Sequence, residues 1–578
     1  MTPRNAPLSS PLSSWSWALP PIYHTIGVSV SLDDLFSRPL ALVGNTGSGK
    51  SWTVASAVQR CLEALQPPEQ YRPKFIVLDI NGEYAKAFGT TAHARQPNHV
   101  YVNSHEYGLP LWTFDLHELV HYFEASAATQ VPVLDQVVTL ARATGPGTSP
   151  AHHQLLRLDW ALGLLRALVA YTQESGGKFV GRNARKTMSN LHELLLLLRN
   201  DAEQRSQPAT RQAADAALTA LQESSEIEPL LLSADQDEYY CFTGLDVQVR
   251  EGIQSISQSL EPLLASAHST LLAESGLPPL TADIPCPFPP PMLDEPSLFD
   301  SALSGMRGEQ RMHEYVATLR LRIRRKLQDR RWRVFRGNEE DLFTEVLCPL
   351  LGLDFIPHQG GGDTGSSSSQ ALPEDSATVV IIDCSMLAHD VLPFFCAVVG
   401  RLLLDVREHA NPDQRINRPW VLVLEEAHNY LRPRREGEDP GLTLSREAFE
   451  RIAKEGRKFG MSLIIASQRP SDVSDTVLSQ CANFIVHRIQ NPDDIDYFKR
   501  ILPGGSREML DQVSILSPGE ALPLGSAVNV PCRVRVHKPN PSPKSDTPEP
   551  SQHWKTEAVF DIEKAIANWL GQEDIGHD

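Results

Sequence analysis

The stretch Gly44-Asn45-Thr46-Gly47-Ser48-Gly49-Lys50-Ser51 decides the fold class, because it matches the phosphate-loop pattern GxxxxGK[ST] at every required position. An apolar run at 39–43 precedes it, and a segment with helical character, 52–65, follows it. Glycines let backbone N–H groups turn around phosphate oxygens, and a helix N-terminus adds the positive end of its dipole. We therefore expect bound ATP, with Lys50 on its β- and γ-phosphates and the Ser51 hydroxyl on Mg²⁺. The expected nucleotide contacts are the eight residues of this loop and Trp52.

A second run supplies the acids that hydrolysis needs. Residues 420–424 are apolar and lead directly into Glu425 and Glu426. Because carboxylates at the end of a buried strand lie beside a phosphate loop, we expect Glu425 to hold Mg²⁺ through water and Glu426 to act as general base. The next apolar run, 462–466, is followed by Gln468, which we expect to sense the γ-phosphate or orient the attacking water. The alternative for Gln468 is a simple strand-to-loop transition.

The apolar runs predict an α/β fold with a mostly parallel sheet buried on both faces, because each short β-branched run is followed by polar residues and then by helical spacing. These runs are 40–43, 75–80, 378–382, 420–424, 462–466 and 484–489. From about 112 to 330 the chain is instead rich in Leu and Ala at helical spacing, as in Leu155, Leu158, Leu162, Leu165 and Val169, or Ala213, Ala217 and Leu221. The sequence therefore predicts a large helical bundle inserted into the α/β core.

Composition narrows the location and the mode of any DNA binding. The 578 residues carry a formal charge of −18, which argues against coating nucleic acid by bulk charge but leaves a local basic channel open. Residues 320–336 hold nine bases and one acid, with Trp332 and Phe335 among them, and predict either a phosphate-tracking surface or a structural segment with solvated arginines.

The eight cysteines are scattered, and no signal peptide or membrane segment is visible. A cytoplasmic protein with reduced thiols is the simplest interpretation.

One helix offers cations that a neighbouring subunit could use. The segment 446–459 contains Arg446, Arg451, Arg457 and Lys458, and Arg457 stands at its end, just before the Gln468 run. An arginine delivered from a neighbour can stabilise the charge of a phosphoryl-transfer transition state. The alternative is a solvated helix, since Glu447, Glu450 and Glu455 are interleaved.

Five separated motifs together resemble the HerA-like ATPases of the HerA/FtsK superfamily. They are GNTGSGKS (44–51), LDINGEY (78–84), LEEAHNYL (424–431), RIAKEGRKFGMSLIIASQRP (451–470) and LSPGEALPLGSAV (516–528). The resemblance covers about 26–104 and 315–537. It implies a RecA-like core at 38–104 and 315–537, a short N-terminal segment at 1–37, the inserted helical domain at 105–314, and a linker with a C-terminal helix at 538–578.

The resemblance also implies a function. Family members form hexameric rings that move double-stranded DNA, so we expect a homohexamer and an ATPase that works as a DNA translocase or helicase-like motor. It favours Lys50, Glu426, Gln468 and, acting in trans, Arg457 as catalytic residues, places Asp79 and Glu83 beside the nucleotide, and points to Arg432, Arg434, Arg435 and Arg469 for DNA contact. His428 has no second ligand at helical spacing, so we expect it to form a hydrogen bond within the ATPase site or interface rather than bind metal.

The front of the chain departs from the family, whose members commonly begin with a small β-barrel. Only 43 residues precede Gly44, enough for the last strand of such a barrel. This departure favours an anti-phage defence complex with an effector, either a NurA-like or other nuclease or a sirtuin-like NADase. Two alternatives stay open: a nucleotide-switched scaffold that activates an effector, and a type IV secretion-like ATPase.

Overall fold

The computed structural model describes the parts of the chain that contain the predicted α/β core. The described residues are 14–19, 28–65, 73–88, 98–101, 107–144, 161, 179–204, 206–223, 241–242, 262, 265, 269, 285–303, 309–337, 341–353, 377–502, 507–544, 561–563 and 566. Residues 1–543 form one compact unit and 544–578 a second. The Leu155–Val169 stripe and most of the predicted C-terminal helix lie outside the described residues.

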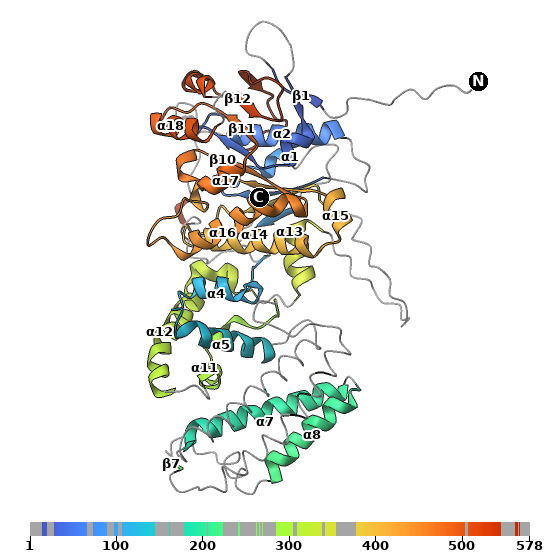
Figure 1. Cartoon of the computed structure of the whole chain (residues 1–578), viewed down its shortest axis with the longest axis vertical. Coiled ribbons are helices and arrows are strands. Elements are labelled where there is room, and N and C mark those ends of the chain that lie inside the picture. The colour runs from blue at the N-terminus through green and yellow to red at the C-terminus, as the bar shows by residue number, and fades with distance from the viewer. Residues whose placement is uncertain are drawn as a thin grey trace, which may run out of the picture. The chain divides into compact units, whose positions relative to one another are not determined.

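A mixed sheet with a parallel centre is the framework of the first unit (Figure 1). Among the described strands its order is β2-β1-β13-β12-β11-β3-β10-β9-β4-β8-β5. The seven strands from β11 to β5 are parallel to their neighbours, whereas β12, β13, β1 and β2 extend the sheet with antiparallel pairs. The bounds are β1 Ser14–Leu19, β2 Val28–Ser31, β3 Leu40–Val43, β4 Lys74–Asp79, β5 Asn98–Tyr101, β8 Val379–Asp383, β9 Trp420–Leu424, β10 Met461–Ser467, β11 Asn483–Val486, β12 Glu520–Gly525 and β13 Val534–Val536. The predicted α/β fold with a mostly parallel sheet is confirmed.

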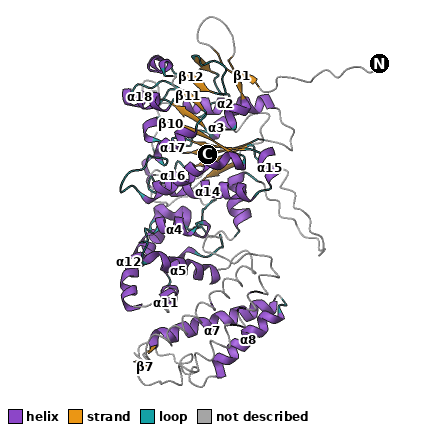
Figure 2. Cartoon of the chain, viewed as in Figure 1, coloured by secondary structure: helices purple, strands orange, loops and turns teal. Residues whose placement is uncertain are grey.

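Side chains of the central strands alternate between two buried clusters. In β3, Ala41 and Val43 belong to one cluster, and Leu40 and Leu42 belong to the other. The strands β4, β8, β9 and β10 divide in the same way. Because successive side chains of a strand point to opposite faces, both faces of the sheet are covered. Figure 2 shows the strands with helices around them.

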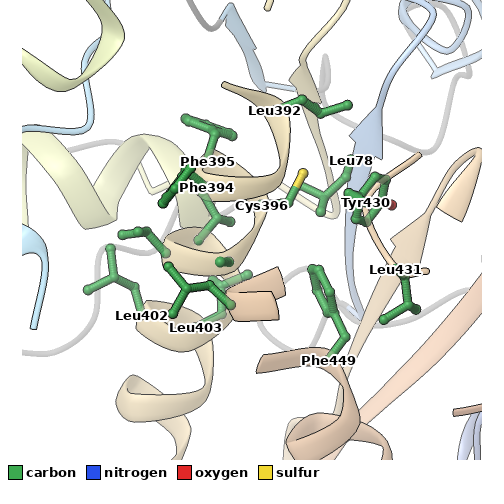
Figure 3. Packing of buried hydrophobic residues seen from close by; sticks show 14 of the residues in the cluster. Leu78, Leu392, Phe394, Phe395, Cys396, Leu402, Leu403, Tyr430, Leu431 and Phe449 are labelled. Carbon is green, nitrogen blue, oxygen red and sulfur yellow. The ribbon is translucent and has the colours of Figure 1, made fainter. Parts of the chain in front are cut away.

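Two helices pack tightly over one face of the sheet. The cluster that contains Leu78 of β4 also contains Phe394 of α14 (Leu392–His409) and Phe449 of α16 (Pro440–Glu455), as Figure 3 shows. A Cβ at Gly441 would lie 2.7 Å from Phe394 Cδ2, so the first turn of α16 has no room for a side chain. The other cluster contains Val54 and Val58 of α2 (Lys50–Leu65).

The predicted strand 484–489 is shorter than expected. β11 ends at Val486, and beyond it the Arg488 carbonyl accepts a hydrogen bond of 2.9 Å from the backbone N–H of Asn45. The neighbouring strand β3 ends at Val43, where the phosphate loop begins. The residues that follow β11 therefore form a backbone hydrogen bond with the phosphate loop instead of extending the strand.

The helical segments share their aromatic core with the α/β part. Trp112, Phe114 and Tyr122 are buried with Trp332 and Phe335. The Tyr122 ring lies 5.5 Å from that of Phe394. The structural interpretation of Trp332 and Phe335 is therefore confirmed. Ala213 and Ala217 of α8 (Pro208–Glu223) are buried as their spacing predicts, whereas the predicted domain boundaries stay predictions.

The remaining described helices are short or belong to the helical segments. They are α1 Leu32–Phe36, α3 Ala85–Phe88, α4 Leu116–Tyr122, α5 Gln130–Thr144, α7 Gly181–Gln204, α8 Pro208–Glu223, α11 Pro296–Leu303, α12 Glu309–Gln328, α13 Cys348–Leu351, α15 Pro412–Asn417, α17 Asp475–Gln480 and α18 Pro492–Ile501. A small hairpin pairs β6 (Phe179–Val180) with β7 (Cys241–Phe242). In the described part of the chain, no helix combines the length and the apolarity needed to cross a membrane.

Candidate nucleotide-binding and catalytic site

The phosphate loop lies between β3 and α2, as its sequence predicts. Gly47 and Gly49 have φ angles of 71° and 109°, a region that side chains disfavour. Lys50 Nζ folds back and donates to the carbonyls of Gly44 (2.9 Å) and Asn45 (3.4 Å). Burial lowers the pKa of Lys50, while the charges of Glu426, Glu425 and Glu83 act in the opposite direction. A triphosphate would replace two weak carbonyl partners of Lys50 with charged oxygens.

Glu425 is buried at the end of β9 and faces the start of α2. Its Oε1 lies 3.4 Å from Ser51 Oγ, and its Oε2 accepts a 2.8 Å hydrogen bond from the Tyr84 hydroxyl. Burial and the neighbouring Glu426 raise the pKa of Glu425. A cation beside this carboxylate would offset the cost of burying its charge.

Glu426 is held from two sides. The Gln468 side-chain amide uses both of its ends: Nε2 donates to Glu426 Oε1, and Oε1 accepts from the Thr46 hydroxyl of the phosphate loop. On the other side, His428 Nδ1 lies 3.2 Å from Glu426 Oε2. Although burial raises the pKa of Glu426, His428, Lys50 and Gln468 bring it below its ordinary value. An ionised carboxylate held in this way is suited to accept a proton from water.

The Asp79-to-Tyr84 turn closes the site from β4. Asp79 is fully buried and accepts 2.9 Å from the backbone N–H of Tyr84. Burial raises the pKa of Asp79 to about 6 and also raises that of Glu83, which forms a hydrogen bond with Ser51. Asp79 therefore shapes the turn, and Glu83 reaches the Ser51 hydroxyl.

His487 is a supporting residue that the sequence did not single out. Its Nε2 lies 2.9 Å from Thr53 Oγ1 of α2, and its Nδ1 lies 2.8 Å from the Glu520 carbonyl. Burial lowers the pKa of His487 to about 4, so the ring is neutral at pH 7, with Nδ1–H donating to Glu520 and Nε2 accepting from Thr53. A Cβ at Gly44 would lie 2.5 Å from His487 Cβ, so His487 is packed against the phosphate loop.

The oxygen donors at this edge fit Mg²⁺. Ser51 Oγ and Glu425 Oε1 are neighbours, and Glu83 Oε2 is buried without a hydrogen-bond partner among the described residues. Within the described residues, no group of three or more His, Cys, Asp or Glu side chains could hold a metal ion alone. This arrangement suits Mg²⁺, which takes most of its ligands from phosphates and water.

The other predicted residues lie outside this cluster. Trp52 is half-buried and forms a cation–π contact with Lys538, whose Nζ lies 5.0 Å from the centroid of the Trp52 ring. Arg457 is exposed before the first residue of β10, whereas Gln468 follows the last, so the two lie at opposite ends of this strand. Arg432, Arg434, Arg435 and Arg469 lie on the loops after β9 and β10, where Arg435 and Arg469 both pair with Asp472.

The parallel sheet, the phosphate loop and the paired carboxylates of β9 define a P-loop nucleoside triphosphatase. Residues 22–228 match the family model described as "Helicase HerA, central domain". The chain is 32% identical over 192 residues to the DNA double-strand break repair helicase HerA of Sulfolobus acidocaldarius, covering 33% of this chain and 38% of that protein. It is 38% identical over 119 residues to the helicase of the same name from Pyrococcus furiosus, covering 21% of this chain and 20% of the relative.

Residues 22–228 are therefore similar to the central domain of the HerA helicases. The chain spans less than two fifths of the length of these curated relatives. A solved structure of the genome packaging NTPase of Sulfolobus turreted icosahedral virus 2 overlaps 28% of this chain and 69% of its own, at a TM-score of 0.21 and 15% identity. A likeness at that level carries no weight for the assignment.

Proposed function

We propose that this chain is an ATP-hydrolysing motor that moves along double-stranded DNA as a homohexameric ring. The observation that supports it best is the meeting of Lys50, Glu425, Glu426 and Gln468 at one edge of the sheet, although they come from three separate segments. Structural roles alone do not need a buried carboxylate pair beside a phosphate loop, because burying such charges costs free energy.

The residues divide the chemistry between binding and proton transfer. The phosphate loop and Lys50 would hold the triphosphate, and the Ser51 hydroxyl, with Glu425 acting through water, would hold Mg²⁺. The metal supplies charge neutralisation of the phosphate oxygens when it is bound. Glu426 accepts the proton of the attacking water, and Gln468 links that carboxylate to Thr46 so that water and γ-phosphate are aligned. His428 Nδ1 lies 3.2 Å from the second oxygen of Glu426.

The proposal assigns Arg457 to the active site of a neighbouring subunit. Arg446 forms a buried ion pair with Glu438, and Arg451 pairs with Glu408 at 2.6 Å. Arg457 is exposed and makes no ion pair with any residue that the structure describes. It is therefore available at the surface, at the end of β10 away from its own Gln468.

The motor would use its loop arginines on DNA and work with an effector in the cytoplasm. Arg432, Arg434, Arg435 and Arg469 follow the strands that carry Glu426 and Gln468. The relatives are called DNA double-strand break repair helicases, which supports DNA as the substrate. A nuclease or NADase effector, in DNA processing or anti-phage defence, is the partner that we infer.

ATP hydrolysis with and without duplex DNA tests the proposal. We expect Mg²⁺-dependent hydrolysis that duplex DNA stimulates. Lys50→Ala should abolish it, and Glu426→Gln should lower the rate by at least about a hundredfold, because a general base contributes roughly that much. Both variants should keep the wild-type circular dichroism spectrum. Undiminished hydrolysis in both would contradict the site.

The same variants separate a motor from a nucleotide-switched scaffold. A scaffold needs bound nucleotide only, so its Glu426→Gln variant would still activate the effector with ATP bound. A motor with this substitution would lose both translocation and effector activation. Displacement of a protein block from duplex DNA measures translocation directly.

A further inference from the structure

Two loops follow the strands of the catalytic edge, β9 and β10, and contact each other. We name residues 431–439 loop A and residues 468–474 loop B. Loop A follows Glu425 and Glu426 after a single 3₁₀ turn, and loop B follows β10. Two contacts join them. The backbone N–H of Ser474 donates to the Leu431 carbonyl at 2.9 Å, and Asp472 of loop B pairs with Arg435 of loop A as well as with Arg469 of its own loop. Just before the loops, Ser467 Oγ lies 3.4 Å from His428 Nδ1.

Asp472 lies between Arg435 of loop A and Arg469 of loop B. Its Oδ1 is 3.5 Å from Arg435 Nη2, and its Oδ2 is 3.6 Å from Arg469 Nη1. The side chains of the two arginines are 66% and 70% exposed, against 31% for Asp472. Two solvated cations therefore share one carboxylate, and the group has one net positive charge.

The backbone under this group is firmly held. Glu438 of loop A forms a buried ion pair with Arg446, and the Asp439 side chain caps α16. In loop B the Ser471 hydroxyl donates 2.6 Å to Asp494 of α18, and the Ser474 hydroxyl donates 2.7 Å to Glu450. Rigid loops with exposed arginine ends are suited to a repeated, regular partner.

We propose that Asp472 is a positioning residue that holds Arg435 and Arg469 as a pair until phosphodiester groups of duplex DNA displace it. This inference rests on the proposed function. Exposed ion pairs are weak, whereas an arginine fork binds a phosphate through two charge-assisted hydrogen bonds and releases condensed counterions. Phosphates therefore replace Asp472 readily. Asp472 in turn limits how tightly the loops hold DNA, which lets a moving motor release it.

His428 and Ser467 shortly precede loops A and B, and the contacts of these two residues connect the loops to the catalytic carboxylate. The His428 carbonyl accepts a 2.9 Å hydrogen bond from Arg432 Nε, while its ring contacts Glu426. Ser467 Oγ also accepts from the backbone N–H of Arg469 at 3.2 Å. Arg432 therefore contacts His428, whose ring lies beside Glu426, and Arg469 is connected to the same ring through Ser467.

Binding of a labelled duplex to the full chain, followed by fluorescence anisotropy over a series of KCl concentrations, tests the inference. Asp472→Asn should tighten binding about threefold to fivefold at low salt and steepen the salt dependence by about one unit of slope. In the Arg435→Gln/Arg469→Gln background the same change should give almost no gain, because its effect passes through these arginines. The matched control is Asp493→Asn on α18, whose side chain pairs with no described arginine.

Each outcome decides one question. If wild type fails to bind duplex at any salt concentration, the proposed function fails and the inference falls with it. If wild type binds but Asp472→Asn behaves like Asp493→Asn, only the inference is overturned. An equal gain in both arginine backgrounds also overturns it, because that result indicates general charge attraction. Circular dichroism of each variant confirms that the fold is intact.

Discussion

Glu426 joins a strained backbone to a carboxylate with partners on both oxygens. Its φ of 42° and ψ of 47° place a non-glycine residue in the left-handed region, which costs on the order of 1–3 kcal/mol. Gln468 and His428 hold its two oxygens. Glu425 instead contacts Ser51 and Tyr84, so the two adjacent acids have different partners. This difference is the residue-level basis for assigning one to the metal and the other to the water.

Tyr84 determines where the Glu425 carboxylate lies. Tyr84→Phe keeps the ring against Phe88 and removes only the hydroxyl that donates to Glu425 Oε2. We expect the Mg²⁺ concentration for half-maximal hydrolysis to rise about tenfold, because groups that orient a metal ligand contribute about that factor. The Mg²⁺ dependence of fluorescent nucleotide binding should shift in parallel.

Tyr430→Phe is the matched control for this prediction. The Tyr430 hydroxyl donates to the backbone carbonyl of Glu425 at 3.2 Å, not to its carboxylate. The control should therefore change stability but leave the Mg²⁺ dependence close to wild type. Equal Mg²⁺ dependence in wild type and Tyr84→Phe would contradict the role of Tyr84.

Asp79 should make the stability of the protein depend on pH. Burial raises its pKa from 3.8 to about 6, so between these values the folded state binds more protons than the unfolded state. The contribution of Asp79 to the free energy of unfolding is therefore present below about pH 4 and is lost as pH rises through 6. From pH 4 to pH 7, the stability of Asp79→Asn relative to wild type should improve by about 3 kcal/mol.

Urea unfolding of the two proteins across this pH range measures the difference. Asp383 and Glu83 also act on the pKa of Asp79, and both are present in wild type and variant, so their own titrations largely cancel in the comparison. A constant difference between the two proteins from pH 4 to pH 7 would show that Asp79 titrates normally.

At the scale of elements, the close contact between α14 and α16 depends on Gly441, which has no side chain to separate the two helices. Gly441→Ala would place a Cβ 2.7 Å from Phe394 Cδ2, and the Phe394 ring is buried. We expect a loss of about 1–3 kcal/mol in the free energy of unfolding, the usual cost of overpacking. Thermal unfolding measures it, with Lys454→Ala on the exposed face of α16 as the control. A melting temperature as high as that of the control would show that the helices can move apart freely.

The elements were predictable where local pattern decides them. Continuous apolar runs such as 420–424 gave the central strands, since burial on both faces leaves no polar position. The end of β11 was not predictable, because it depends on Arg488 meeting the distant Asn45. The hydrogen bond from Tyr84 to Glu425 and the ion pair of Asp472 with Arg435 were not predictable either, because the two partners of each pair are far apart along the chain. The motifs identified the catalytic edge but not how its side chains hold one another.

At the scale of the molecule, the charge of −18 and the proposed DNA binding are compatible because the arginines proposed to contact DNA are few and lie on two neighbouring loops. Arg435 and Arg469 project from two neighbouring loops, and Asp472 already neutralises part of their charge. Binding should therefore depend on a small number of phosphate contacts and weaken steadily with salt. Electrostatic repulsion from the rest of the chain then favours movement over tight retention.

The last prediction concerns the assembly, because Arg457 cannot serve the active site of its own subunit. β10 separates Arg457 from Gln468, and its seven residues span about 23 Å at the usual rise of a strand. We expect Arg457→Ala to lower hydrolysis by about a thousandfold, the contribution of an arginine supplied in trans. Lys458→Ala, one residue further along and equally exposed, should have a small effect.

Mixing two inactive variants tests the trans arrangement. An Arg457→Ala subunit keeps a complete Lys50–Glu426 site, and a Glu426→Gln subunit keeps its arginine. Where the second stands beside the first, an intact site forms, so co-assembled rings should recover part of the wild-type rate while each variant alone stays inactive. Size-exclusion chromatography with light scattering confirms that both variants assemble. Mixed rings as inactive as their components would place the arginine elsewhere, and a monomeric wild type would remove the need for one.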